Sequence, residues 1–215
     1  MRDILGGFAE NWTEATNVVL GASHFPDLEP VHGGVDVQVV RSSPGSGGTA
    51  TGQLFFATIA GARERLWVTT AYFAPDEAFV DLFCDASARG VDVRLLVNGP
   101  NVDKEVVRET GQRQYGRLLE AGVRIFEYQP TMLHAKVMIA DGWANLGSSN
   151  LEHRSLGLDE ELIVAVDNAA LVDELARHFA EDLDASEEFD LDRWRRRSLA
   201  KRARERAGDL FRQSL

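Results

Sequence analysis

Cysteine and long apolar runs are the scarcest features of this sequence of 215 residues. The one cysteine, Cys84, lies in the apolar segment 79–84, where a buried core thiol is expected rather than a reactive one. A single cysteine excludes a disulfide within the chain, which fits a reducing compartment. No run of 18 or more apolar residues and no signal-peptide pattern occurs, so we expect a cytoplasmic protein without a membrane-spanning helix.

Positive charge is scarce as well, except at the C-terminal end. Residues 191–215 hold nine Lys+Arg and three Asp+Glu, the other 190 residues hold 14 and 31, and the net charge is -11. This acidic body argues against a general nucleic-acid-binding protein. The tail also contains Trp194, Leu210 and Phe211, and predicts a basic amphipathic helix that contacts an anionic membrane surface. The alternative is a helix whose arginines pair with the acidic body.

Apolar periodicity predicts one α/β domain. The hydrophobic content of 44% suffices for a substantial core, and strand-like and helix-like segments alternate along the chain. Strands are expected at 35–40, 66–70, 91–97, 123–128, 133–140, 143–146 and 161–166, and helices at 3–20, 51–62, 76–89, 104–121 and 168–183. This order predicts an α-β-α sandwich with a mixed, mostly parallel sheet and a β-hairpin.

The hairpin carries the most informative pattern of the chain. His134 and Lys136 stand two residues apart in an apolar run, and a strand places such residues on one face. The dipeptide Asp141-Gly142 then supplies a two-residue turn. Counting back from this turn, the expected pairs are Ala140 with Trp143, Met138 with Asn145, Lys136 with Gly147 and His134 with Ser149.

This register brings small hydrogen-bonding residues beside the histidine and the lysine. Ser148, Ser149 and Asn150 follow Gly147, whose lack of a side chain allows a close backbone approach. A lone histidine in a strand is usually a hydrogen-bonded core residue. The added lysine and the returning polar segment favour a phosphate site at this end of the hairpin.

The pattern His-x-Lys-(x)4-Asp followed by Gly-Ser-x-Asn resembles the HKD motif of the phospholipase D superfamily. The flanking segments 71–77, 118–130 and 154–156 are similar to the second half of bacterial cardiolipin synthase-like proteins, and the resemblance covers nearly the whole chain. Two departures stand out. The gap from Asp141 to Gly147 is one residue shorter than usual, and Asp159 stands where such proteins usually carry asparagine.

The resemblance implies phosphodiester transfer through a phosphohistidine. We expect His134 to be the nucleophile, because phosphorylated imidazole leaves readily in the second step. Lys136 would neutralise the phosphate oxygens, and Ser148, Ser149 and Asn150 would bind the same phosphate. Asp141 completes the catalytic motif. A strand at about 3.3 Å per residue nevertheless puts it about 23 Å along the chain from the histidine, so a structural role in the turn is expected.

A different carboxylate is needed to hold the imidazole in one tautomer. Glu161 matches the family's downstream glutamate and is the candidate, with Glu160 and Asp159 as alternatives. A solvated acidic cluster is the other interpretation of this trio. No cofactor and no metal ion are expected, because the lysine and the histidine already supply positive charge.

Members of this superfamily use two HKD motifs, in which one histidine is the nucleophile and the other is the proton donor. This chain has a single HKD motif. His24, His32, His153 and His178 are not followed by lysine two positions later. Either two copies pair across a two-fold axis, or the chain is the C-terminal half of a longer enzyme. The second alternative divides the chain into a helix and linker that end a preceding half (1–30), an HKD domain (31–190) and the basic helix (191–215).

Three functions remain open at this point. The first is a phosphatidyl transferase or phospholipase acting on a phosphatidylglycerol-like phospholipid, active only with a second HKD half and in peripheral contact with the membrane. The second is a nuclease-type phosphodiesterase, against which the acidic body argues because phosphate tracking needs clustered Lys and Arg. The third is a non-catalytic half that only binds phosphate or a protein partner.

Overall fold

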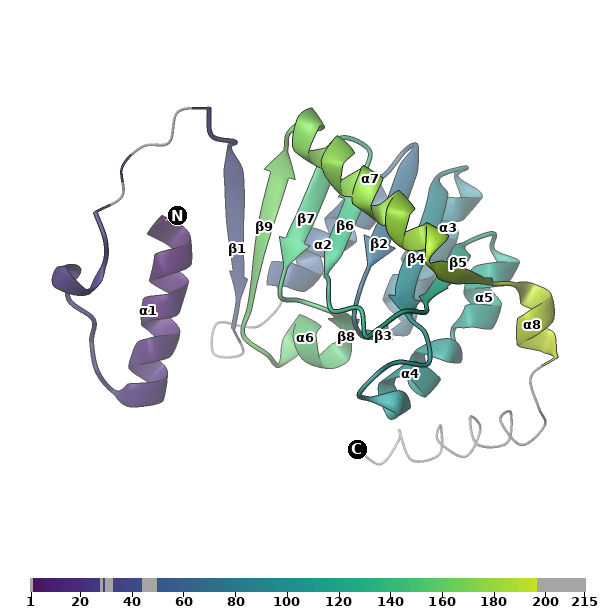
Figure 1. Ribbon diagram of the computed structural model, residues 1–215, viewed down its shortest axis with the longest axis horizontal. Coiled ribbons are helices and arrows are strands. Elements are labelled where there is room, and N and C mark those ends of the chain that lie inside the picture. Colours follow the sequence, from purple (N-terminus) through teal and green to yellow (C-terminus); the bar gives the residue numbers. More distant parts are fainter. Residues whose placement is uncertain (1, 28, 30–32, 44–49, 197–215) are drawn as a thin grey trace.

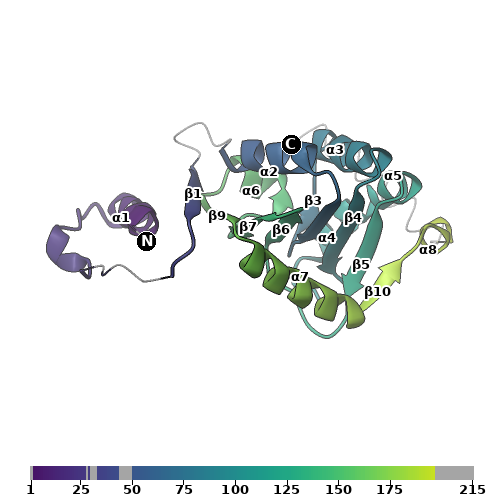
Figure 2. The same cartoon turned by 90° about the horizontal axis from the view of Figure 1, so that it is seen from above.

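The computed structural model describes residues 2–27, 29, 33–43 and 50–196. Its centre is one eight-stranded sheet with the strand order β1-β9-β7-β6-β2-β4-β5-β10. In that order the strands are Val37–Ser42, Glu161–Asp167, Trp143–Gly147, Val137–Ala140, Arg65–Thr69, Asp92–Asn98, Arg124–Tyr128 and Ser186–Phe189. Figure 2 shows helices α2 (Ala50–Gly61), α3 (Glu77–Ala88) and α5 (Tyr115–Glu120) on one face and α7 (Ala169–Asp184) on the other. The predicted α-β-α sandwich is confirmed.

The expectation of a mostly parallel sheet is wrong. Only the pairs β2–β4 and β4–β5 are parallel, and the five other neighbouring pairs are antiparallel. A parallel pair needs a long crossover connection, and α3 supplies one between β2 and β4. The short turn of the β6–β7 hairpin instead reverses the chain, so these two strands pair antiparallel.

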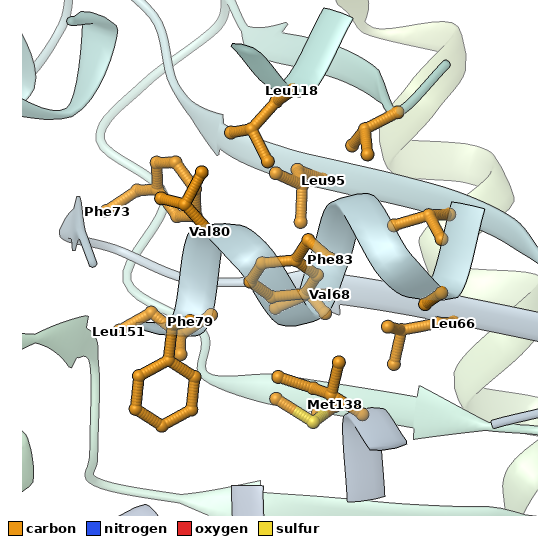
Figure 3. Close-up of a cluster of buried hydrophobic side chains, with 14 of the residues drawn as sticks. Leu66, Val68, Phe73, Phe79, Val80, Phe83, Leu95, Leu118, Met138 and Leu151 are labelled. Atoms are coloured by element: carbon orange, nitrogen blue, oxygen red, sulfur yellow. The ribbon is translucent and has the colours of Figure 1, made fainter. Parts of the chain in front are cut away.

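The main core lies between the sheet and the helices α2, α3 and α5. Figure 3 shows Val80 and Phe83 of α3 against Leu66, Val68 and Leu95 of the central strands. Because strand side chains alternate between faces, the intervening residues form a second layer under α7. That layer contains Ile139, Ala144, Val172 and Ala176 in one cluster and Leu96, Phe126 and Phe179 in another.

The hairpin has the predicted register. Ala140 pairs with Trp143 and Met138 with Asn145, and Gly147 N donates to Lys136 O over 3.2 Å. Asp141 turns the chain with φ 52°, in the left-handed region that aspartate tolerates better than most residues. Strand β6 begins at Val137, however, so His134 lies in the segment that leads into the strand rather than in the strand itself.

Two other predictions differ from the structure. The expected helix over 104–121 is two helices, α4 (Glu105–Gln112) and α5. Gly111 lies so close to the chain before it that an added Cβ would come within 1.8 Å of Phe73 O. The small parallel sheet β3 (Phe73–Ala74) with β8 (Leu151–Glu152), the short helix α6 (His153–Gly157) and the edge strand β10 were not predicted.

The two ends of the chain differ in how firmly they contact the domain. Helix α1 (Arg2–Thr16), which the 3_10 turn η1 (Ala22–His24) follows, lies beyond edge strand β1, where Glu10 pairs with Arg41 over 2.6 Å (Figure 1). At the other end, α8 (Leu191–Arg195) packs the partly buried Trp194 against the main core cluster. Residues 197–215 of the predicted basic helix lie outside the described residues. None of the described helices combines the length and the apolar character that a membrane-spanning segment requires.

Candidate active site

Apart from Asp141, the predicted site residues gather at one edge of the sheet. There the C-terminal ends of β2, β4, β5 and β7 meet the beginnings of β6 and β9. In Figure 1 this edge faces down, next to β3, β8 and α6. The strand ends hold the segments 133–136 and 148–150 next to each other, because the hairpin joins them in register.

His134 and Lys136 are in direct contact. The Lys136 Nζ lies 3.0 Å from Nδ1 and 3.1 Å from Nε2 of the imidazole, and it donates to His134 O over 2.9 Å. The histidine is exposed, whereas the lysine side chain is only 9% exposed. An accessible imidazole therefore stands over an ammonium group that the fold holds in place.

Burial has an electrostatic consequence for Lys136. Loss of water around the ammonium lowers its pKa below the ordinary 10.5, and the carboxylates of Glu161 and Glu152 partly offset this effect. An ammonium group short of water binds an incoming anion more strongly than a solvated one.

Ser148 and Glu161 form a pair beside the lysine. The Ser148 hydroxyl donates to Glu161 Oε2 and accepts from Leu162 N over 3.0 Å. Glu161 is 8% exposed, and its charge acts on Lys136. Among the described residues no hydrogen bond joins Glu161 to His134, so its expected role in orienting the imidazole stays a prediction.

The remaining residues of the returning segment are also buried at this edge. Asn150 Oδ1 accepts from Tyr72 N over 3.2 Å, which leaves the amide nitrogen of Asn150 without a protein partner in the described chain. Ser149 is 2% exposed and lines the same small cavity as Lys136. At Gly147 a Cβ would lie 2.1 Å from Leu162 O, so only glycine permits this approach of β7 to β9.

Asp141 lies at the opposite end of β6 from His134. Its carboxylate accepts three backbone N–H bonds of 2.9–3.0 Å, from Arg63, Glu64 and Arg65. The Arg65 guanidinium also donates to Asp141 O over 3.0 and 2.8 Å. Asp141 thus ties the hairpin turn to the start of β2, which is the structural role expected from its position in the turn.

Two residues at the site were not singled out from the sequence. Asn98, 3% exposed at the end of β4, donates to Ala71 O and Leu133 O and accepts from Leu133 N, so it fixes the segment that carries His134. Tyr72 stands with its ring at 82° to the imidazole, 6.2 Å between centroids. In the sequence, an asparagine directly after an apolar strand could have indicated Asn98 as a site residue.

No group of three or more His, Cys, Asp or Glu side chains in the described part of the chain is arranged to hold a metal ion. What the geometry offers is an exposed imidazole, one buried cation and hydrogen-bond donors. This set suits attack on a phosphate ester.

Comparison with known proteins places residues 55–183 in a family model described as cardiolipin synthase, PLD-like domain. The chain is 33% identical over 198 residues to cardiolipin synthase 2 of Bacillus anthracis. The aligned region covers 91% of this chain but only 38% of that protein. It thus spans well under half the length of this relative.

Solved structures share the fold at low identity. Nuc from Salmonella typhimurium, a phospholipase D family member, matches 72% of this chain and 99% of its own with a TM-score of 0.61 at 18% identity. The phosphatidylserine synthase of Haemophilus influenzae matches 71% of this chain and 40% of its own, with a TM-score of 0.61 at 15% identity.

Proposed function

The chain belongs to the phospholipase D-like family of cardiolipin synthase domains, and we propose from this premise that it carries one half of a phosphatidyl transfer site. The contact between the exposed His134 and the buried Lys136 is the observation that carries this proposal. The substrate is a glycerophospholipid of the phosphatidylglycerol type. The named activity of the Bacillus anthracis relative supports this substrate class.

In the first step a ring nitrogen of His134 attacks phosphorus, and the bond from phosphorus to the headgroup oxygen breaks. The Lys136 ammonium turns its donors from the imidazole to the phosphate oxygens, where negative charge grows in the transition state. Asn150 offers its amide nitrogen to the same oxygens, and Ser148 helps to hold Glu161 near the site. The product is a phosphatidyl group bound to His134 and a free headgroup alcohol.

In the second step the hydroxyl of an acceptor attacks the phosphohistidine, the bond from phosphorus to nitrogen breaks, and the imidazole is restored. An alcohol acceptor gives transfer and water gives hydrolysis. Glu161, whose carboxylate accepts from Ser148, would stabilise the cationic imidazole by its charge, as a positioning residue.

The headgroup oxygen leaves on the side of phosphorus opposite the nucleophile, so a second group has to protonate it. One imidazole cannot occupy both sides. We therefore propose that a second HKD half completes the site, either upstream in the same polypeptide or in a second copy of the chain. The 38% coverage of the Bacillus anthracis protein supports the first arrangement.

The tail adds a further element to the proposal. Arg193 pairs with the buried Glu127 and with Glu187, and Arg195 with Glu120, so these two arginines contact the acidic body. We propose that the basic residues beyond Arg196 contact anionic lipid, which would make the protein peripheral at the cytoplasmic face of a membrane.

Transfer from phosphatidylglycerol labelled in its acyl chains to ethanol tests the proposed function. The chain is assayed alone and together with the first half of a full-length cardiolipin synthase. We expect phosphatidylethanol only when a second HKD half or a dimer is present, and none with His134→Asn. The matched control His178→Asn, on the exposed surface of α7, should keep full activity. Product formation by a strictly monomeric preparation, or by His134→Asn, would refute the proposal.

A further inference from the structure

Lysine is rare in this chain, and its distribution is uneven. Only three of the 23 Lys+Arg residues are lysines, namely Lys104, Lys136 and Lys201. The first two lie at the same edge of the sheet, because Lys136 contacts His134 and Lys104 contacts the neighbouring Tyr72. Arginine serves nearly everywhere else, so two compact point charges beside one site need a reason.

The Lys104 side chain packs on an aromatic ring, but no ion pair neutralises its charge among the described residues. It precedes α4, and its Nζ lies 4.6 Å from the centroid of the Tyr72 ring, a cation–π arrangement. Its side chain makes no hydrogen bond and no ion pair with the residues that the structure describes. An exposed ammonium group therefore keeps its hydrogen-bond donors available for a ligand.

Tyr72 fixes the distance between the two cationic groups and the nucleophile. Its backbone N–H donates to Asn150, and its hydroxyl donates to both carboxylate oxygens of Asp103 over 2.8 and 2.9 Å. Burial and the nearby Asp103 raise the pKa of this hydroxyl to about 12, so the ring stays neutral. With 4.6 Å to the ammonium and 6.2 Å to the imidazole, Lys104 Nζ lies within about 11 Å of the His134 ring.

The surroundings of Lys104 suit a ligand that carries both a phosphate and hydroxyl groups. Asp103 and the half-buried Glu152 offer carboxylate oxygens that accept bonds from hydroxyls, and Glu152 is close enough for the charge of Lys104 to act on its pKa. The phosphate itself has to lie on the side of Lys104 that faces away from these carboxylates, since like charges repel.

We propose that Lys104 binds the phosphate of the acceptor lipid while the donor phosphate occupies His134 and Lys136. This inference rests on the proposed function and names its second substrate, a glycerophosphate lipid with a free hydroxyl. Transfer to the free hydroxyl of such an acceptor joins two phosphates through a three-carbon glycerol, six bonds that span about 7 Å when extended, on the scale of about 3.6 Å for three bonds of a polypeptide. This span lies below the upper limit of about 11 Å that the two contacts of the Tyr72 ring set on the separation between Lys104 and His134.

Binding of two soluble probes tests the proposal without requiring turnover. Glycerol 1,3-bisphosphate carries both phosphates and glycerol 3-phosphate carries one, and calorimetry gives each affinity for the full chain. We expect the wild-type chain to bind the bisphosphate about five- to tenfold more tightly, the strength of one additional charged contact. Lys104→Gln should lower bisphosphate affinity to the monophosphate level and leave monophosphate affinity unchanged.

Arg177→Gln is the matched control, because it removes one positive charge from the exposed surface of α7. It should leave the preference for the bisphosphate intact. Equal affinities for the two probes in the wild-type chain, or equal losses in Lys104→Gln and Arg177→Gln, overturn the role of Lys104 alone. A wild-type chain that binds neither probe overturns the phosphate site itself, and with it the proposed function.

Discussion

The Lys136 ammonium has to be charged to bind phosphate, yet the fold removes most of its water. Burial lowers its pKa, and only the nearby carboxylates of Glu161 and Glu152 partly restore it. The alkaline limit of phosphate binding should therefore reflect this one side chain.

The affinity for glycerol 3-phosphate should fall as pH rises toward the lowered pKa of Lys136, before the ordinary lysine value of 10.5 is reached. The affinity falls rather than rises because the Lys136 ammonium in the folded protein loses its proton more easily than a solvated lysine does. Lys136→Arg should shift the loss to higher pH, since guanidinium stays protonated up to about pH 12. Calorimetric titrations between neutral pH and pH 10 measure both curves, and identical curves would contradict this explanation.

We expect Asp141 to contribute to stability rather than to phosphate binding. Burial raises the pKa of its carboxyl, but the three backbone donors and the Arg65 charge outweigh that effect, so the pKa lies below 3.8. A depressed carboxyl pKa stabilises the fold above pH 3.8, and this contribution is lost as pH falls through the folded-state value.

Asp141→Asn should cost about 1 to 3 kcal/mol of unfolding free energy at neutral pH, because one acceptor oxygen is lost and a backbone donor is left unpaired. Urea titration measures this difference, which should shrink below pH 3.8. Glycerol 3-phosphate binding should be unchanged in the folded variant. A variant with wild-type stability but no phosphate binding would instead give Asp141 a direct role in the site.

At the scale of the element, the hairpin was predictable because its period and its turn are both local. Alternation set the faces, and Asp141-Gly142 set the register of 137–140 against 143–146. The contributions of Asn98 and Tyr72 were not predicted, since each reaches the site from another strand end through contacts made only in the folded sheet.

The errors at this scale also have tertiary causes. The helix expected over 104–121 is interrupted after Gln112, next to Gly111, whose backbone lies directly against Phe73. Strand β10 has the sequence Ser-Glu-Glu-Phe, which lacks apolar alternation, and pairing with β5 is what makes it a strand. The prediction of a mostly parallel sheet was wrong because the alternation of helices and strands along the chain does not determine how β1 and β9 pair.

Helix α8 packs its Trp194 against Gly116, where there is no room for a side chain. A Cβ at Gly116 would lie 2.5 Å from Trp194, whose indole N–H donates to Gln112 O over 3.3 Å. Gly116→Ala should therefore cost about 1 to 3 kcal/mol through overpacking and release α8. Faster tryptic cleavage after Arg195 and Arg196 would report the release.

The control for this prediction is Gly61→Ala at the end of α2, where an added Cβ meets nothing within 4 Å. This variant should keep wild-type cleavage rates and stability. If both variants are cleaved alike, the Gly116–Trp194 contact does not hold α8 in place.

At the scale of the whole molecule, charge is divided between an acidic body and a basic tail. The tail's first arginines already pair with Glu127, Glu187 and Glu120. Removal of residues 197–215 should reduce sedimentation with phosphatidylglycerol liposomes and leave binding to neutral phosphatidylcholine liposomes unaffected. The difference should diminish at high salt, because the attraction is electrostatic. Equal sedimentation of the two chains with anionic liposomes would remove the membrane role from the tail.

The proposed phosphatidyl transfer depends most on His134, the nucleophile that this chain supplies by itself. Bis(4-nitrophenyl) phosphate tests this directly, because nitrophenolate leaves without a proton and so needs no second HKD half. We predict a burst of about one nitrophenolate per chain, with an acid-labile phosphoryl adduct at His134 in the mass spectrum, and neither with His134→Asn. An undiminished burst in His134→Asn, or an adduct on another residue, would contradict the account.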